Sequence, residues 1–328
     1  MNAVELFKLK KTFSFKTGSL FNRHSQEVVA VDEVSLVVEQ GQSVAFIGPN
    51  GAGKSTTIKM LTGILYPTSG TVCVLGLTPW KQRNELARQM GVVFGQRSQL
   101  WYHLPPADTF DLLARIYDLD LPPYRKRRDM LVERFGLGSF LTTPVRKLSL
   151  GQRMRAELAA SLLHNPRILF LDEPTIGLDI VARQELRDLI REWNRQDGLT
   201  IFLTSHDTGD IEGVARRVII INHGGVVFDD KVSILRRRYL GSKVLSVKFH
   251  DLPQLVVMPG VTVIKASDHA LTIEVNTAMV AIDQVVDRVL KSGSVADITI
   301  EDPPLEEVIA HIYSTPQDNT QDPTNQEL

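Results

Sequence analysis

Residues Gly48-Pro49-Asn50-Gly51-Ala52-Gly53-Lys54-Ser55 decide the fold class of this 328-residue chain. They match the phosphate-binding template G-x-x-x-x-G-K-[ST] at every fixed position. The apolar run Ser43–Ile47 before them is typical of a buried parallel strand, and the apolar spacing of Thr56–Leu61 after them is typical of a helix. Strand, glycine-rich loop and helix in this order predict an α/β fold with a nucleoside triphosphate site.

The loop carries its own chemistry. Its glycines let the backbone turn tightly with N–H groups facing inward, and the following helix adds a positive N-terminal end. We expect Lys54 to reach the β- and γ-phosphates and the Ser55 hydroxyl to bind Mg²⁺. The residues predicted to bind ATP in this segment are Gly48, Pro49, Asn50, Gly51, Ala52, Gly53, Lys54, Ser55 and Thr56.

Two further apolar runs end in polar side chains. Arg167–Leu171 leads directly to Asp172 and Glu173, and Thr200–Thr204 leads to His206. Ligands bind at the carboxyl edge of open parallel sheets, so these side chains are candidates for one site. Asp172 is the candidate for holding Mg²⁺. Glu173 is the candidate for polarising an attacking water, a role worth about 10²–10⁴ in rate.

Composition excludes several classes of function. The formal net charge is −1, from 37 Lys and Arg against 38 Asp and Glu, so we expect no nucleic-acid partner. Cys73 is the sole cysteine, which excludes an intramolecular disulfide and favours a reducing compartment. Met1–Lys11 lacks the apolar core of a signal peptide, and no apolar run approaches the ~20 residues of a membrane span. Any pore must therefore come from another chain.

The chain divides into three predicted regions. Residues 1–238 form the nucleotide-binding region, within which Trp101–Leu141 is predicted to be a largely helical insert. Residues 243–313 read as strands and helices in the order βββαβα and predict a small α+β accessory domain. Residues 314–328, rich in Pro, Gln, Asn, Asp and Thr, predict a disordered tail.

The order of motifs resembles that of ATP-binding-cassette (ABC) ATPases. Leu148-Ser149-Leu150-Gly151-Gln152 resembles the family's signature sequence, with Leu150 in place of its first glycine. Ile176-Gly177-Leu178-Asp179 looks like the D-loop, and Val92–Gln96 looks like the strand and Q-loop. The resemblance implies a P-loop NTPase cassette with a mainly parallel sheet core, an antiparallel β subdomain and a helical subdomain.

The resemblance also implies roles for residues. Lys54, Gln96, Glu173 and His206 would be catalytic, with His206 sensing the γ-phosphate. Ser55, Gln96 and Asp172 would bind Mg²⁺. Two copies would pair head to tail, so that Ser149, Gly151, Gln152 and Asp179 of one copy complete the ATP site of the other. Ser149 and Asp179 also have a simpler interpretation as helix N-caps.

An aromatic side chain near the N-terminus stacks on adenine in the family. The candidates are Phe13, Phe15 and Phe21, among which the hypothesis favours Phe21. The alternative for each of them is that the ring packs against other side chains and does not contact adenine.

Two short sequence segments narrow the resemblance to one subfamily. Residues 94–101 and 148–155 look like those of ABC-2-type exporter ATPases related to viologen exporters. The implied partners are ABC-2-type permease subunits, and the implied location is the cytoplasmic face of the membrane. Two alternatives remain open: a soluble cassette acting on ribosomes or DNA, and an importer ATPase.

Overall fold

The computed structural model of the chain describes residues 1–17, 24–95, 98–239, 242–251, 258–302 and 305–314. The chain separates into two compact units, Met1–Val232 and Ser233–Leu328.

The first unit alternates strands and helices. Its elements are, in chain order, β1 (Asn2–Thr17), β2 (His24–Glu39), β3 (Ser43–Ile47), α1 (Lys54–Leu61), β4 (Ser69–Val74), α2 (Arg83–Ala87), β5 (Met90–Phe94), α3 (Pro106–Ile116), α4 (Leu121–Arg134), the 3₁₀ turn Val145–Lys147, α5 (Leu150–Leu162), β6 (Ile168–Asp172), α6 (Ile180–Asp197), β7 (Thr200–Thr204), α7 (Thr208–Val214), β8 (Arg217–Asn222) and β9 (Gly225–Lys231). The sequence-predicted strand before the glycine-rich loop is thus β3, and α1 begins at Lys54.

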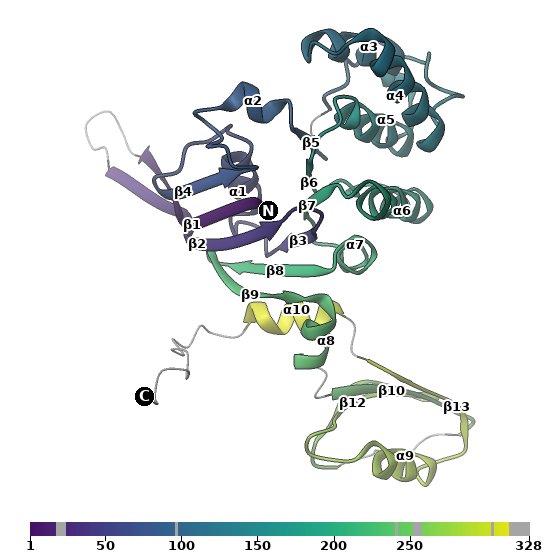
Figure 1. Cartoon of the computed structure of the whole chain (residues 1–328). Coiled ribbons are helices and arrows are strands. Elements are labelled where there is room, and N and C mark those ends of the chain that lie inside the picture. Colours follow the sequence, from purple (N-terminus) through teal and green to yellow (C-terminus); the bar gives the residue numbers. More distant parts are fainter. Residues whose placement is uncertain (18–23, 96–97, 240–241, 252–257, 303–304, 315–328) are drawn as a thin grey trace. The chain divides into compact units, whose positions relative to one another are not determined.

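A six-stranded sheet is the centre of this unit. Its strand order is β5-β6-β7-β3-β8-β9, and every pair is parallel except the last, β8 with β9. The sheet carries helices α5, α6 and α7 on one side, and α1 with a second sheet on the other (Figure 1). The parallel strands are therefore covered on both faces, which explains their nearly continuous apolar sequences.

Alternation along the strands divides the core between the two faces. Leu169 and Leu171 of β6 pack in a cluster with residues of α5 and α6. Ile168 and Phe170 pack in the opposite cluster, together with α1 and the second sheet. Because strand side chains alternate with a period of two, one strand supplies both cores.

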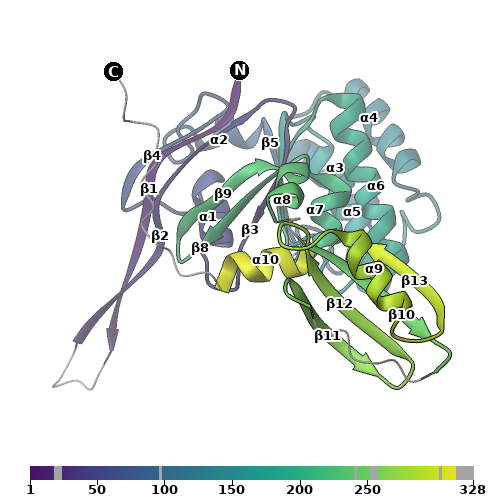
Figure 2. The same cartoon turned by 90° about the horizontal axis from the view of Figure 1, so that it is seen from below.

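The second sheet is antiparallel, with the order β2-β1-β4. Strand β4 pairs with β1 only between Val4 and Lys10, whereas β2 pairs with β1 as far as Thr17. The outer part of the β1–β2 hairpin is consequently a two-stranded arm (Figures 1 and 2).

The helical subdomain comprises α3, α4 and the start of α5. Its apolar residues, among them Phe110, Leu131 and Met154, join the cluster on the α5–α6 face of the main sheet. Pro105 precedes α3 and Pro106 opens it, where a missing backbone N–H costs nothing.

The second unit contains α8 (Val232–Tyr239, whose first residue ends the first unit), β10 (Ser242–Phe249), β11 (Val261–Ser267), β12 (Ala270–Asn276), α9 (Ile282–Leu290), β13 (Val295–Glu301) and α10 (Leu305–Ser314). Its sheet is antiparallel with the order β11-β12-β10-β13. Helix α9 buries Val285 and Val289 against Leu245 and Ile273 on one face of this sheet (Figure 2). The α+β composition agrees with the sequence reading, and α10 includes Ser314, the first residue of the expected tail. The rest of that tail, 315–328, lies outside the described residues.

Among the described residues, no helix is long and apolar enough to cross a membrane.

Candidate functional site

The main sheet aligns the ends of three neighbouring strands. Phe94, Asp172 and Thr204 lie side by side in one row, because Phe94 of β5 pairs with Asp172 of β6, and Asp172 pairs with Thr204 of β7. Glu173 follows immediately after this row, and His206 follows two residues after Thr204. Side chains that are far apart in the sequence thus meet at the carboxyl edge of the sheet, where such folds bind ligands.

The loop between β3 and α1 is closely packed. Gly53 has a φ of 102°, and a Cβ built there would lie 2.2 Å from the carbonyl oxygen of Ala30 in β2. At Gly48 a Cβ would lie 2.4 Å from the carbonyl oxygen of Ile221. Both positions therefore require glycine, one for conformation and both for space.

Lys54 points back into this loop. Its Nζ donates to the carbonyl oxygens of Gly48, at 2.6 Å, and Pro49, at 3.2 Å. Burial lowers the pKa of the Lys54 ammonium, while the charges of Glu173 and Asp172 oppose that shift. The ammonium is thus held beside the loop, where the phosphate-binding sequence pattern places the phosphate oxygens of a nucleotide.

Asp172 is fixed by two hydroxyl groups. Thr204 Oγ1 donates to its Oδ1 at 2.6 Å, and Ser55 Oγ donates to the same oxygen at 3.3 Å. Mg²⁺ in nucleotide sites takes one or two protein oxygens together with phosphate oxygens. The Ser55 hydroxyl and the Asp172 carboxylate fit that requirement.

Glu173 has an unusual backbone conformation. Its φ of 53° lies in the left-handed region, which is uncommon for a residue with a side chain and is enriched at functional sites. Its backbone N–H donates to Thr204 O at 3.0 Å, and Gly95 N donates to Asp172 O at 2.8 Å. A Cβ on Gly95 would lie 2.2 Å from Glu173 O, so the segment after β5 lies against the backbone of Asp172 and Glu173.

A cavity of about 520 Å³ opens in front of these groups. Its lining comprises Ala30, Asn50, Gly51, Gly53, Lys54, Ser55, Thr56, Lys59, Ile64, Phe94, Asp172 and Glu173. Two ammonium groups, an α-helix N-terminus and two carboxylates therefore border one space, and this donor set fits a triphosphate with its Mg²⁺. Gly48, Pro49 and Ala52 belong to the loop but not to this lining.

The signature residues line a different and smaller cavity, of about 130 Å³. Ser149 caps α5: its Oγ accepts from Gln152 N at 3.2 Å, and Ser149 N donates to Gln152 Oε1 at 2.9 Å. Asp179 likewise caps α6, accepting from Ala182 N at 2.9 Å. The N-cap interpretation thus holds for both residues, and their roles toward ATP stay predictions. Ser149, Gly151, Gln152 and Asp179 share this cavity, apart from the glycine-rich loop.

The unusual Leu150 has a local reason. A Cβ on Gly177 would lie 3.1 Å from Leu150 Cδ2, and a Cβ on Gly151 would lie 3.0 Å from that of Ala182. Leu150 is partly buried against the apolar cluster of α5 and α6. The leucine therefore packs the start of α5 onto the D-loop of the same chain.

Two predicted site residues, Gln96 and Phe21, lie outside the described residues. Phe13 and Phe15, the other candidates for stacking on adenine, have ring centroids 6.2 Å apart on β1. The sequence reasoning missed Glu157. Its buried carboxylate accepts from Ser98 Oγ and, at 3.1 Å, from Gln99 N, and burial raises its pKa. A lone acidic residue inside the apolar run of α5 was the available signal.

Comparisons with known proteins agree with this geometry. A family model described as "ABC transporter" matches residues 31–176. The ABC transporter ATP-binding protein NatA of Bacillus subtilis (strain 168) is 33% identical over 208 residues, covering 63% of this chain and 84% of NatA. The daunorubicin resistance ATP-binding protein DrrA3 of Streptomyces coeruleorubidus is 32% identical over 290 residues, covering 86% of this chain and 90% of DrrA3.

Among solved structures, a dimeric ATP-binding cassette in a post-hydrolysis state bound to ADP and Pi superposes with a TM-score of 0.60. It is 26% identical and covers 70% of this chain and 98% of that cassette. The order of the motifs, the topology of the sheet and these relatives all indicate the same family. The chain belongs to the family of ABC transporter ATP-binding proteins and is an ATPase of that family.

Proposed function

We propose that two copies of this chain close head to tail around two MgATP and drive export through separate ABC-2-type permease subunits. One observation carries the proposal: each chain holds two incomplete half-sites. Lys54, Asp172 and Glu173 line one cavity, and the signature residues Ser149 and Gly151 line another. A second copy would bring the exposed Ser149 of one chain to the γ-phosphate held by the other.

The chain's own residues divide the chemistry of hydrolysis. Lys54 and the backbone of Gly51, Gly53 and Ser55 would hold the phosphates. Ser55 and Asp172 would hold Mg²⁺, which would supply positive charge to neutralise the phosphate oxygens. Glu173 orients the attacking water and accepts its proton, while His206 lies beside it. Gln96, outside the described residues, is proposed to complete the Mg²⁺ site.

Of the two candidates among the described residues, Phe13 and Phe15, the proposed adenine platform is Phe13. Ala30 lines the nucleotide cavity, and its neighbour Val29 pairs with Thr12. Phe13 pairs with Val28, two residues from Ala30, whereas Phe15 pairs with Gln26, four residues away. At about 3.3 Å per residue, Phe13 is the nearer ring to the cavity.

The helical subdomain offers a surface for a permease. Trp101, Tyr102 and Leu104 are exposed just after the segment of Gln96. Arg146 N donates to Tyr102 O and Val145 N donates to Leu104 O, both at 3.0 Å, shortly before the signature residues. Exposed aromatic side chains of this kind favour protein interfaces. This docking would place the chain at the cytoplasmic face of the membrane.

Purification from native membranes in mild detergent tests the export proposal. We expect polytopic membrane proteins as stoichiometric partners, and ATPase activity that Ser149→Ala lowers without weakening ATP binding to the monomer. Ribosomal or DNA-bound partners with none from the membrane would refute export. Equal loss of ATP binding by monomeric Ser149→Ala would refute a site shared between copies.

A further inference from the structure

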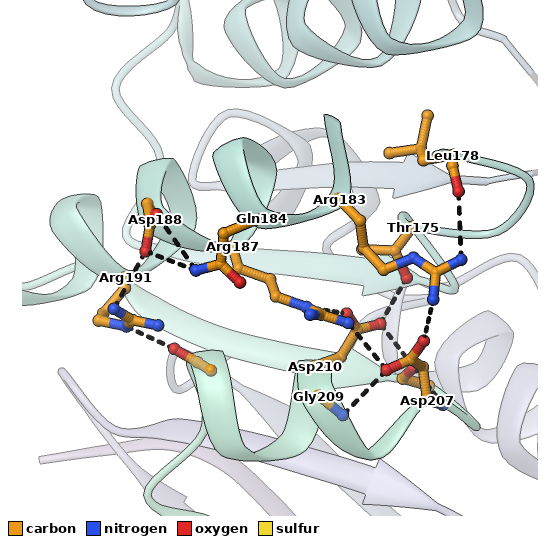
Figure 3. A network of polar contacts seen from close by, with 12 residues as sticks. Thr175, Leu178, Arg183, Gln184, Arg187, Asp188, Arg191, Asp207, Gly209 and Asp210 are labelled. Atoms are coloured by element: carbon orange, nitrogen blue, oxygen red, sulfur yellow. Dashed lines mark hydrogen bonds and ion pairs between the residues drawn. The ribbon is translucent and has the colours of Figure 1, made fainter. Parts of the chain in front are cut away.

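We propose that Arg183 is a positioning residue that transmits contact with the second copy, made at the D-loop, to His206, which lies beside Glu173 of the candidate site. One guanidinium joins the two segments: Nη2 donates to the Leu178 carbonyl oxygen at 3.1 Å, and Nη1 donates to Asp207 Oδ2 at 2.5 Å (Figure 3). Leu178 precedes Asp179 of the D-loop, and Asp207 follows His206. The inference rests on the head-to-tail dimer of the proposed function.

The D-loop end of this link faces outward. Asp179 caps α6, so a displacement of the D-loop displaces the first turn of the helix that carries Arg183. Ile180 is 84% exposed and Val181 is 68% exposed, although both are apolar and begin a helix. A partner that covers the signature cavity would also cover this helix end, because Asp179 lines that cavity.

The other end of the link fixes the backbone on both sides of His206. Asp207 N donates to Ser205 Oγ at 2.9 Å, and Asp207 Oδ1 accepts from Gly209 N at 2.9 Å as the cap of α7. His206 itself is free to respond, because its side chain is 59% exposed. Movement of Asp207 therefore changes the position of the His206 imidazole relative to Glu173.

A buried ion pair forms the fixed base of the network. Arg187 Nε donates to Asp210 Oδ1 at 2.7 Å, and its Nη2 donates to Asp207 Oδ1 at 2.8 Å, so Asp207 has a second arginine partner (Figure 3). Asp210 also accepts from the hydroxyls of Thr175 and Ser205. Asp210 is 1% exposed, so removing its partner would leave a buried charge and destabilise the fold. The Arg183 side chain is 31% exposed, and of these two arginines bound to Asp207 it is the one that also binds the Leu178 carbonyl oxygen at the D-loop. A rigid, planar guanidinium suits this task, since lysine offers one ammonium in place of two fixed donors.

The test compares three variants of the full-length chain. Arg183→Ala removes the link, Arg183→Lys keeps the charge, and Arg191→Ala is the matched control. Arg191 also joins α6 to α7, through Gly213 O at 2.5 Å, but it does not contact Asp207. We expect Arg183→Ala to lower kcat at least about tenfold, because small misplacements of catalytic groups are costly. KM for ATP and monomer affinity should change less than twofold, Arg183→Lys should be intermediate, and Arg191→Ala should keep the wild-type kcat.

A second measurement separates chemistry from association. In a Glu173→Gln background, Arg183→Ala should still form the ATP-dependent dimer, at the same ATP concentration that Glu173→Gln alone requires. Loss of that dimer, an unchanged kcat in Arg183→Ala, or an equal loss in Arg191→Ala would each overturn the inference. If the Glu173→Gln protein with MgATP forms no dimer, the proposed function fails and this inference falls with it. If Glu173→Gln dimerises and wild type turns over, but Arg183→Ala matches the wild-type kcat, the inference alone fails.

Discussion

His206 Nδ1 lies 3.5 Å from Glu173 Oε1, although the two residues follow different strands of the main sheet. The pairing of β6 with β7 produces this proximity, because Asp172 and Thr204 share a row. Glu173 accepts a left-handed backbone conformation to reach its place, and the hydrogen bond from its N–H to Thr204 O holds it there. A carboxylate that lines the nucleotide cavity and a largely exposed imidazole are thereby brought together at the carboxyl edge of the sheet.

Glu173→Gln keeps the shape of the side chain but removes the base. We expect kcat to fall by about 10²–10⁴, with ATP affinity retained and an ATP-bound dimer accumulating. Phosphate release and gel filtration in MgATP would measure both effects. Glu133→Gln, on an exposed position of α4, is the control and should behave as wild type. Normal turnover in Glu173→Gln would show that another group is the base.

Gly95→Ala tests the close approach of the segment after β5 to the carboxylates. The new Cβ would lie 2.2 Å from the Glu173 carbonyl oxygen, so backbone must move. We expect kcat to fall at least about tenfold, since a misplacement of about 1 Å is enough for a large loss. Gly138→Ala is the matched control, because nothing lies within 4 Å of its Cβ position. Full activity in Gly95→Ala would mean that the exact path of this segment does not matter to hydrolysis.

Phe13→Ala tests the adenine platform. Stacking of a base on an aromatic ring is worth about 1–3 kcal/mol, so the Kd for ATP should rise at least about fivefold. Affinity for inorganic triphosphate should not change, because it has no base. Phe15→Ala removes a neighbouring ring on the same arm and should alter ATP affinity less than twofold. The opposite result for the two variants would assign the platform to Phe15.

Much of the site could be read from the sequence because its groups stand at the ends of apolar runs. Strand ends at Ile47, Asp172 and Thr204 agree with the sequence reading, and parallel pairing then requires that they meet. The βββαβα order of the second unit was equally visible, because hydrophobic alternation is a local property.

Contacts between distant residues could not be read in this way. The link from Arg183 to Asp207 depends on how α6 crosses α7, and arginines on an amphipathic helix usually face solvent. The same holds for Glu157, whose partners Ser98 and Gln99 belong to another segment. Leu150 stands where the family's signature sequence has glycine, and its side chain fits there because Gly177, which lies against it, has no side chain.

His164 predicts a pH dependence of stability. Burial against the Tyr117 ring, with centroids 4.1 Å apart, lowers the pKa of its imidazole to about 4, although the hydrogen bond from Nε2 to Met90 O opposes the shift. A histidine whose folded pKa lies below its unfolded value of 6.5 binds fewer protons when folded, so stability falls as pH drops from 6.5 toward 4.

Because of this imidazole alone, the free energy of unfolding should fall by about 2 kcal/mol as the pH is lowered from 7 to 5. His164→Gln keeps a donor for Met90 O but does not titrate, so urea unfolding of the variant should lose that part of the pH dependence. His250→Gln, on a histidine of the second unit, controls for general effects. An equal pH dependence in His164→Gln and wild type would show that the imidazole is not buried in its neutral form.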